Sequence, residues 1–442
     1  EPEPAPETAP RLNDKVQLTG TATAYTGAAT DGAQVRWRVV RQVRFPDWWY
    51  WRRWWLPPAQ QSSQEIARGT ATTDARGKFA IEFLAQPDPA IAEKDDPNFH
   101  YSIYADVTDQ AGETRSAQRV VRVGYTALNA TMSAADWLVE EKPVEVSIHT
   151  ATLDGEGQQA EGSLKIYSLK EPEKTHRAPL DSHSRRFRPA RGSNADNPPE
   201  PDLSNPNTWP LDKVVAERGF TTDSAGNASS TFSLKAGAYR AVLETQDRFG
   251  KKVTAELPLR VLDPESGHLA IKMPHLFDAP AWSVEPGDEF MALWGSGYKS
   301  ARAYVEIEHR GKLLKSYWTD PDQTQATVSQ KVTEAMRGGF TVRVTMVREN
   351  RAYLAQRHVS VPWSNKDLKV SWERFVSKLE PGQKETWTAV ITGADAKKRA
   401  AEMVATLYDQ SLDAFLPHQW PNGFGVFRED SSNLHSQFEN SL

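Results

Sequence analysis

Cysteine is absent from all 442 residues of the sequence. Disulfide bonds, thiolate metal sites and a cysteine nucleophile are therefore excluded within this chain. The absence also removes the usual clue to the cellular compartment, because a chain without cysteine suits a reducing cytosol and an oxidising periplasm equally well. Any fold must rest on packed cores and hydrogen bonds.

Long apolar runs and a secretory leader are missing as well. No stretch stays apolar over the length that a transmembrane helix needs. A large excess of one charge is also missing, since 53 basic and 58 acidic residues leave a net charge of −5. This balance gives no electrostatic reason to expect nucleic acid or an anionic membrane as a partner.

Catalytic and metal-binding motifs are the third absence. The ten histidines are scattered and form neither H-x-H nor H-E-x-x-H, whereas a metal site needs two or three converging ligands. Neither G-x-S-x-G nor a P-loop occurs. The acidic run at residues 93–96 is most simply a solvated loop before Pro97. We therefore expect no enzyme activity, no catalytic residue, no cofactor and no metal.

Short runs of alternating apolar and polar residues are what the sequence does contain, at residues 35–40, 165–169, 303–307 and 341–347. A period of two places one face of a strand in a core and the other in water. Short strands separated by Gly, Asp, Asn and Pro are typical of antiparallel sandwiches. The length suits three or four domains. The predicted fold class is all-β, with tandem immunoglobulin-like antiparallel β-sandwich domains.

Two segments share a pair of turns with the pattern D-x-x-G. The first turn of each precedes a predicted strand, and the second lies between two predicted strands. They are TDARG at 73–77 and TDQAG at 108–112, then TDSAG at 222–226 and QDRFG at 246–250. Asp caps its own turn through its side chain, and Gly accepts a positive φ. The match predicts two copies of one fold; calcium binding by the Asp oxygens is the weaker interpretation.

A second repeat is the turn E-P-G-[DQ], at residues 285–288 and 380–383. It relates a third domain to a fourth, whose short length indicates truncation. The predicted domains are a Pro/Glu-rich linker at 1–15, sandwiches at 16–124, 125–263 and 264–362, and a partial sandwich at 363–442. Two insertions interrupt them, a Trp-rich one at 45–64 and a long loop at 172–210.

Several stretches, taken in order, resemble the macroglobulin-like domains of bacterial α2-macroglobulins. They are 19–22 with Gly27, 32–33 and 35–39, then Val359-Ser360-Val361-Pro362 before 368–370, then 379–383, and finally 407–415 (LYDQSLDAF). The last is the most specific, because in that family a strand ending in Asp and a short apolar turn come just before the bait region. The resemblance covers nearly the whole chain from Leu18.

The resemblance implies a protease trap, in which a protease cuts an exposed bait segment, strain is released, and the scaffold closes around the protease. The chain would be a scaffold fragment of a broad-range endopeptidase inhibitor, with target proteases, and other envelope proteins, as partners. A periplasmic location is expected, with any membrane anchor outside this sequence. Some members carry a Cys-x-Glu-Gln thioester. Either that domain lies outside this sequence, or the protein belongs to the branch without it.

The Trp-rich insertion is the strongest candidate for partner binding. Trp and Arg are enriched where protein surfaces bind partners, and five tryptophans so close together cannot all face one sandwich core. Packing against a neighbouring domain and docking of a protein or glycan both remain open. The candidate residues are Trp48, Trp49, Trp51, Trp54, Trp55, Arg52 and Arg53.

The end of the chain is the candidate approach to the bait. The resemblance implies a strand at 403–408 and helix only at 411–415. Beyond Leu416, Ser, Asn and Gly indicate flexible, cleavable chain. Arg428 would suit trypsin-like proteases, and Phe424 or Phe427 chymotrypsin-like ones. An ordinary strand and loop is the alternative.

Two other functions remain open at this level, because a sandwich fold hosts many functions. One is a cell-envelope adhesin or assembly module that binds a protein or glycan. The other is the non-catalytic part of a polysaccharide-processing enzyme.

Overall fold

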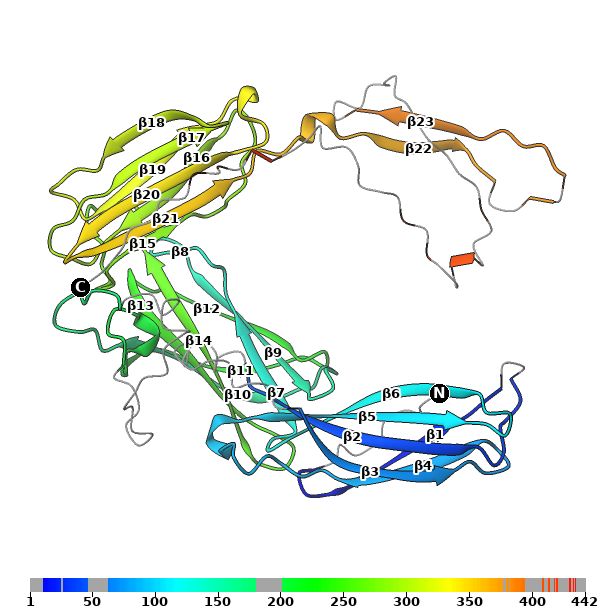
Figure 1. Ribbon diagram of the computed structural model, residues 1–442. Coiled ribbons are helices and arrows are strands. Elements are labelled where there is room, and N and C mark those ends of the chain that lie inside the picture. The colour runs from blue at the N-terminus through cyan, green and yellow to red at the C-terminus, as the bar shows by residue number, and fades with distance from the viewer. Residues whose placement is uncertain are drawn as a thin grey trace. The chain divides into compact units, whose positions relative to one another are not determined.

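The computed structural model describes residues 11–24, 27–46, 63–179, 201–376, 379–380 and 382–393, with nine single positions between 408 and 434. The chain divides into two compact units, one of residues 1–265 with 269–273 and one of residues 266–268 with 274–442. Regular structure in the described part consists of strands and short 3-10 turns (Figure 1). No helix there is long and apolar enough to cross a membrane.

The first unit begins with a sandwich of six strands, called copy one. Its smaller sheet pairs β1 (Lys15–Thr21) with β4 (Lys78–Leu84). Its larger sheet has the order β3 (Gln64–Thr72), β2 (Gln34–Arg44), β5 (Asn98–Thr108), β6 (Thr114–Gly124). Alternate residues of the facing strands meet in one core, which includes Val16, Val35, Ile81, Phe99 and Tyr101. The period-two pattern of the sequence therefore places its apolar face between the sheets.

Copy two, in the same unit, repeats this topology and adds a strand to each sheet. The smaller sheet has the order β12 (Asn227–Phe232), β9 (Val144–Thr152), β7 (Leu128–Ser133). The larger has the order β11 (Leu211–Thr221), β10 (Glu161–Leu169), β13 (Gly237–Gln246), β14 (Lys252–Leu262), β8 (Leu138–Val139). Within each copy the shared strands follow one another in the same order.

Copy three lies in the second unit and has the same strand order again. Its sheets are β15 (Leu276–Asp278), β16 (Glu289–Gly295), β19 (Gln325–Lys331), and β18 (Lys312–Trp318), β17 (Tyr304–His309), β20 (Phe340–Arg348), β21 (Arg351–Val359). A hairpin of β22 (Lys369–Arg374) and β23 (Thr388–Thr392) follows. The predicted class, all-β with tandem antiparallel sandwiches, is confirmed. The D-x-x-G turns marked two copies of one topology; the described residues contain three.

The four D-x-x-G turns are built alike, atom by atom. In each, one Asp Oδ1 accepts the backbone N–H groups two and four residues later, at 2.8–2.9 Å. In each, the Gly N–H donates to the Asp carbonyl, and the Gly φ lies between 72° and 86°. The carboxylates therefore cap their own turns, as predicted, and these backbone hydrogen bonds hold the pKa of Asp74 below its usual value. The E-P-G turns are confirmed too, with Gly287 and Gly382 at φ of 100° and 79°.

One part of the segment predicted as a long loop folds tightly. Asn205 caps the short 3-10 turn at Pro206–Thr208 by accepting the N–H of Asn207. Trp209 is only 1% exposed, and its Nε1 donates to the carbonyl of Leu203 over 3.0 Å. Composition alone did not predict this folded turn, because its many polar residues are typical of a loop. Here polar side chains bind backbone groups of the turn, and the indole of Trp209 is buried.

Candidate functional site

The outer face of the larger sheet in copy three carries a buried ion pair. Arg343 on β20 stands between Val342 and Val344, which face the core, so its side chain leaves the opposite face of the sheet. Its Nη2 lies 2.5 Å from Oε2 of Glu308 on β17, and both residues are 5% exposed. Charged groups on the outer face of a sandwich normally stay in water. Their burial shows that another part of the chain covers them.

Asp430 and Ser432, which lie near the end of the sequence, form part of this cover. Ser432 Oγ donates to Oε2 of Glu308 over 3.0 Å and accepts a hydrogen bond from Nη2 of Arg343. The N–H of Asp430 donates to the carbonyl of Gly338 over 2.8 Å. The flexible chain predicted beyond Leu416 is therefore not free at these two positions. Glu308 and Arg343 are the charged partners of Ser432, and the composition of the segment after Leu416 could not reveal them.

Arg310 fixes Asp430 from the other side. Its Nε lies 2.8 Å from Oδ2 of Asp430, whose side chain is 8% exposed, and its Nη2 donates to the carbonyl of Arg337 over 3.2 Å. Arg310 and Gly311 form the tight turn between β17 and β18, both with positive φ. The same hairpin in copies one and two, between β2 and β3 and between β10 and β11, carries the two insertions. One hairpin position thus serves different purposes in the three copies.

Arg337 ties together the exit from copy three. Its side chain, 6% exposed, binds both carboxylate oxygens of Glu334, Oε2 of Glu285, the carbonyl of Pro362 and Oγ of Ser364. The hydrogen bonds with Glu334 raise the pKa of Arg337 and lower that of Glu334. The E-P-G turn is therefore linked through one guanidinium to the chain leaving β21. This is the joint to which the family resemblance pointed.

The motif at 407–415 is described at three positions. The hydroxyl of Tyr408 lies 3.0 Å from both carboxylate oxygens of Asp413, and this hydrogen bond raises the pKa of Tyr408. The contact joins two residues that are five positions apart in the chain. The strand expected at 403–408 and the helix expected at 411–415 otherwise lie outside the described residues.

The other predicted site residues are not placed. The whole set Trp48, Trp49, Trp51, Trp54, Trp55, Arg52 and Arg53 lies outside the described residues, as do Phe424, Phe427 and Arg428. The structure brings together Arg310, Arg343, Glu308, Asp430 and Ser432 instead. Sequence reasoning missed this cluster; its one signal was a charged residue, Glu308 or Arg343, among the apolar residues of β17 and of β20.

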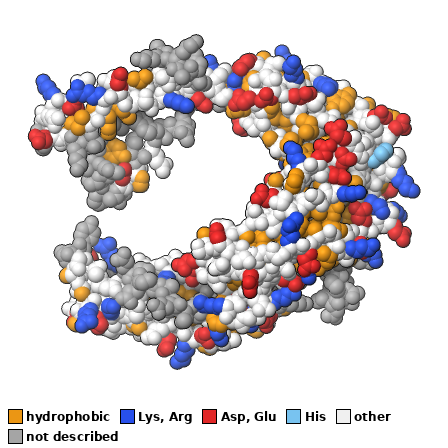
Figure 2. All heavy atoms as spheres, turned by 180° about the vertical axis from the view of Figure 1, so that it is seen from behind, with side chains coloured by type: hydrophobic (Ala, Val, Ile, Leu, Met, Phe, Trp, Pro, Cys, Tyr) orange, Lys and Arg blue, Asp and Glu red, His pale blue; other side chains and the backbone are white. Residues whose placement is uncertain are grey.

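Acidic and basic side chains are mixed on one face of the described residues. On the face drawn in Figure 2, red and blue groups alternate, and neither sign forms one continuous patch.

Residues 275–414 match the model of the alpha-2-macroglobulin bait region domain. This match confirms the family resemblance, and its range includes copy three, the β22–β23 hairpin and Tyr408 with Asp413. It ends before Phe424, Phe427 and Arg428. No curated protein sequence matches the chain.

Solved structures with similarity to the chain include alpha-2-macroglobulins from two bacteria. The native Escherichia coli protein has 12% identity and a TM-score of 0.37, over 88% of this chain and 24% of that one. The Salmonella protein reacted with methylamine has 12% identity and a TM-score of 0.37, over 91% and 25%. The trypsin-activated Escherichia coli protein has 13% identity and a TM-score of 0.32, over 88% and 25%. The chain spans about a quarter of the length of these structures.

Proposed function

Residues 275–414 of this chain match the alpha-2-macroglobulin bait region domain, and from this premise we propose that the chain supplies scaffold domains and the cleavable bait segment of a bacterial endopeptidase inhibitor. The inhibitor traps proteases after cleavage and performs no active-site chemistry of its own. A periplasmic location and a set of domains at 16–124, 125–263, 264–362 and 363–442 belong to the same proposal.

The observation that carries the proposal is the seating of Asp430 and Ser432 on copy three. Residues 414–430 run from the end of the matched domain to this anchored point. A protease cut between residues 414 and 430 would break the covalent link from the matched domain to Asp430, while Asp430 would stay bound to Arg310. A bait must present an extended segment to a protease cleft, and anchors on both sides allow one cut to change the scaffold.

Proteolysis of the chain tests where the trigger lies. We expect trypsin-like and chymotrypsin-like proteases to make one early cut, mapped by intact-mass and peptide mass spectrometry, after Phe424, Phe427 or Arg428. Lys397, Lys398 and Arg399 lie inside the matched domain and are also trypsin sites, so mapping separates the two positions. Arg428→Gln should remove the trypsin cut at 428 and leave the chymotrypsin cuts.

The trapping step needs the full-length parent. We expect the protease that makes the cut to stay associated with the full-length parent through size-exclusion chromatography, and to lose activity on protein substrates while keeping activity on small peptides. No discrete early cut, together with no retained protease, would contradict the proposal. Binding of a glycan or envelope protein through the Trp-rich insertion, without bait cleavage, would favour the adhesin function instead.

A further inference from the structure

The smaller sheet of copy two has an outer face that is almost free of charge. Its strands β7, β9 and β12 alternate between buried positions, such as Val146 and Ile148 in the core, and exposed positions. Three exposed residues on each strand therefore share one surface. With histidine neutral, Glu145 is the one full charge among these nine residues, and the other eight are Asn, Ser, Thr or His.

The strand register arranges these side chains in rows. Residues that pair directly across β7, β9 and β12 point to the same side of the sheet, and neighbouring strands are about 4.8 Å apart. Two complete rows result. They are Thr131, His149 and Asn227, and Ser133, Ser147 and Ser229. Hydroxyl, imidazole and amide groups therefore repeat along the strands and across them.

One contact within the face fixes the orientation of a ring. Nδ1 of His149 lies 3.0 Å from Oδ1 of Asn227. An amide oxygen can only accept a hydrogen bond, so Nδ1 carries the proton and Nε2 of the neutral imidazole is an acceptor. The face therefore combines fixed acceptors with hydroxyls that can donate or accept, which suits a ligand rich in hydroxyl groups.

A pocket of about 380 Å³ opens at one end of this face. Ser133, Ser147 and Glu145 line it from the sheet, and Trp137 and Lys142 line it from the segment that connects β7 with β9. Its volume lies within the range of small-molecule sites, about 300–1,000 Å³. The pocket thus joins one aromatic ring to several hydrogen-bonding groups.

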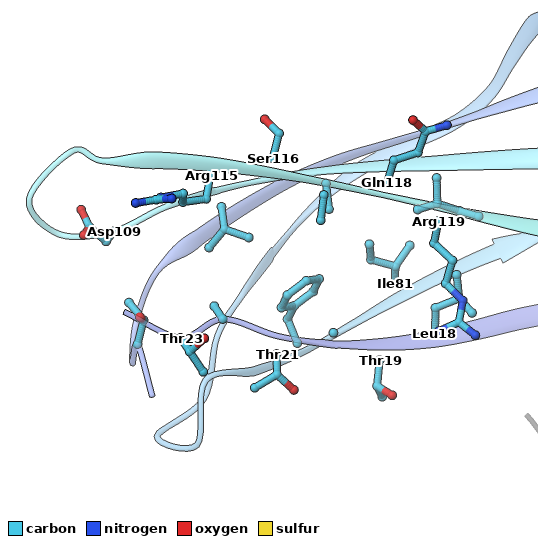
Figure 3. A pocket seen from close by; sticks show the side chains of 18 of the residues that line it. Leu18, Thr19, Thr21, Thr23, Ile81, Asp109, Arg115, Ser116, Gln118 and Arg119 are labelled. Atoms are coloured by element: carbon cyan, nitrogen blue, oxygen red, sulfur yellow. The ribbon is translucent and has the colours of Figure 1, made fainter. Parts of the chain in front are cut away.

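The smaller sheet of copy one has a different outer face. Leu18 of β1 faces a groove of about 360 Å³ beside β6, whereas Thr19 points away from it, to the outer face (Figure 3). That outer face carries Lys15, Lys78 and Glu82, all exposed, and Nζ of Lys15 lies 3.9 Å from Oε1 of Glu82. Long charged side chains are usual on exposed surface. The uncharged face of copy two is therefore not a general property of this fold.

We propose that the pocket and the adjoining rows of copy two bind a neutral glycan. One sugar ring packs on the indole of Trp137, because the C–H groups of a pyranose form an apolar face that an aromatic ring can cover. The hydroxyls of that sugar bind Ser133, Ser147 and the carboxylate of Glu145, and the following sugar units lie along the rows. Such binding is separate from protease trapping and does not depend on it.

The composition of the face favours a glycan over other partners. The core of a protein interface is rich in apolar and aromatic residues, and the nine exposed positions hold no apolar residue. A strongly acidic ligand needs several cations, whereas the pocket has Lys142 beside Glu145. Short hydroxyl side chains lose little rotamer freedom when a ligand covers them. These properties together suit a neutral ligand with many hydroxyls.

Isothermal titration calorimetry of the whole chain with cellotetraose and with chitotetraose tests this site. We expect at least one of them to bind, and Trp137→Ala to weaken binding roughly tenfold or more, as is usual for loss of a central tryptophan contact. Trp137→Phe keeps an aromatic ring and should weaken binding less. Ser147→Lys places a long charged side chain in the middle of the face and should abolish binding. Circular dichroism checks that each variant is folded.

Matched variants separate this site from other surfaces. Gln17→Lys introduces the same charge on the outer face of copy one and should leave binding unchanged. Trp318→Ala removes an exposed tryptophan of β18 and should also have no effect. Protease cleavage of Trp137→Ala should follow the pattern of the parent chain, so a failure of glycan binding can be told apart from a failure of the trapping function.

Three results would overturn the proposal. The first is that neither tetrasaccharide binds at millimolar concentration. The second is binding that Trp137→Ala leaves intact and that Trp48→Ala with Trp51→Ala removes, since this would assign the glycan to the Trp-rich insertion. The third is binding of polygalacturonate in place of both neutral tetrasaccharides, which would identify an acidic ligand.

Discussion

Arg310 Nε lies 2.8 Å from Oδ2 of Asp430, and the two residues are 120 positions apart in the chain. The arginine belongs to the two-residue turn between β17 and β18, and the aspartate follows the candidate cleavage residues. The pair therefore connects the frame of the bait region domain with the chain that comes after it. Loss of this contact should be visible in proteolysis before it is visible in stability.

Arg310→Ala should make the peptide bond after Glu429 more accessible. The arginine is half exposed, so its loss should cost at most about 1 kcal/mol. A local cost of that size opens the segment about fivefold more often. The rate of cleavage by a glutamate-specific protease, followed by mass spectrometry, measures the change. Lys312→Ala, at an exposed position of the same hairpin, should leave the rate unaltered.

Arg343→Ala should destabilise copy three far more than Arg310→Ala. Removal of Arg343 leaves the carboxylate of Glu308 buried without its cation, which costs roughly 3–5 kcal/mol. The double change Arg343→Leu with Glu308→Leu removes both charges and should recover most of that loss. Urea unfolding of the second unit measures both effects. Equal stability of the single and double variants would show that the pair is not desolvated in solution.

The D-x-x-G glycines should fall into two classes. A Cβ at Gly226 would stand 1.9 Å from the carbonyl oxygen of Thr150, and one at Gly77 would stand 2.3 Å from that of Ala22. At Gly112 and Gly250 nothing lies within 4 Å. All four have positive φ, so Ala costs about 1 kcal/mol at each. Thermal unfolding should show that losses at Gly77 and Gly226 exceed those at the other two; equal losses would rule out the backbone clash.

The stability of the second unit should fall in acid through His275. Burial lowers the pKa of His275 to about 4 from 6.5. The unfolded chain therefore takes up the proton first, and the stability that is present above pH 6.5 is lost as the pH falls towards 4. The two limits differ by about 3 kcal/mol. His275→Phe keeps the stacking on Tyr353, whose ring lies 5.7 Å away, and should flatten this part of the pH profile. An unchanged profile would show that other groups produce the slope.

Trp209→Ala should unfold the ordered end of the second insertion. The side chain is almost wholly buried, so truncation should cost roughly 3–5 kcal/mol. Trp209→Phe should cost less, because it loses mainly the hydrogen bond to Leu203. Leu211→Ala, at an exposed position two residues later, is the control. Denaturant unfolding followed by circular dichroism compares the three variants.

Local patterns determined the elements of this protein. Alternation over 35–40 and 341–347 predicted β2 and β20, because neighbouring residues of a half-buried strand point to opposite faces and so alternate between apolar and polar. The four D-x-x-G turns were predictable for a similar reason, since the Asp side chain and the Gly φ act within five residues. The family resemblance also came from short motifs taken in order, and the match at 275–414 confirms it.

Tertiary structure alone decided which distant residues meet. Asp430 and Ser432 read as flexible chain, since their partners, Arg310, Arg343 and Glu308, lie about 90 to 120 residues earlier. Sequence alternation reports which side of a strand faces a core. Alternation does not report which segment covers the other side of the strand. That choice depends on contacts between residues far apart in the chain, which no local pattern connects.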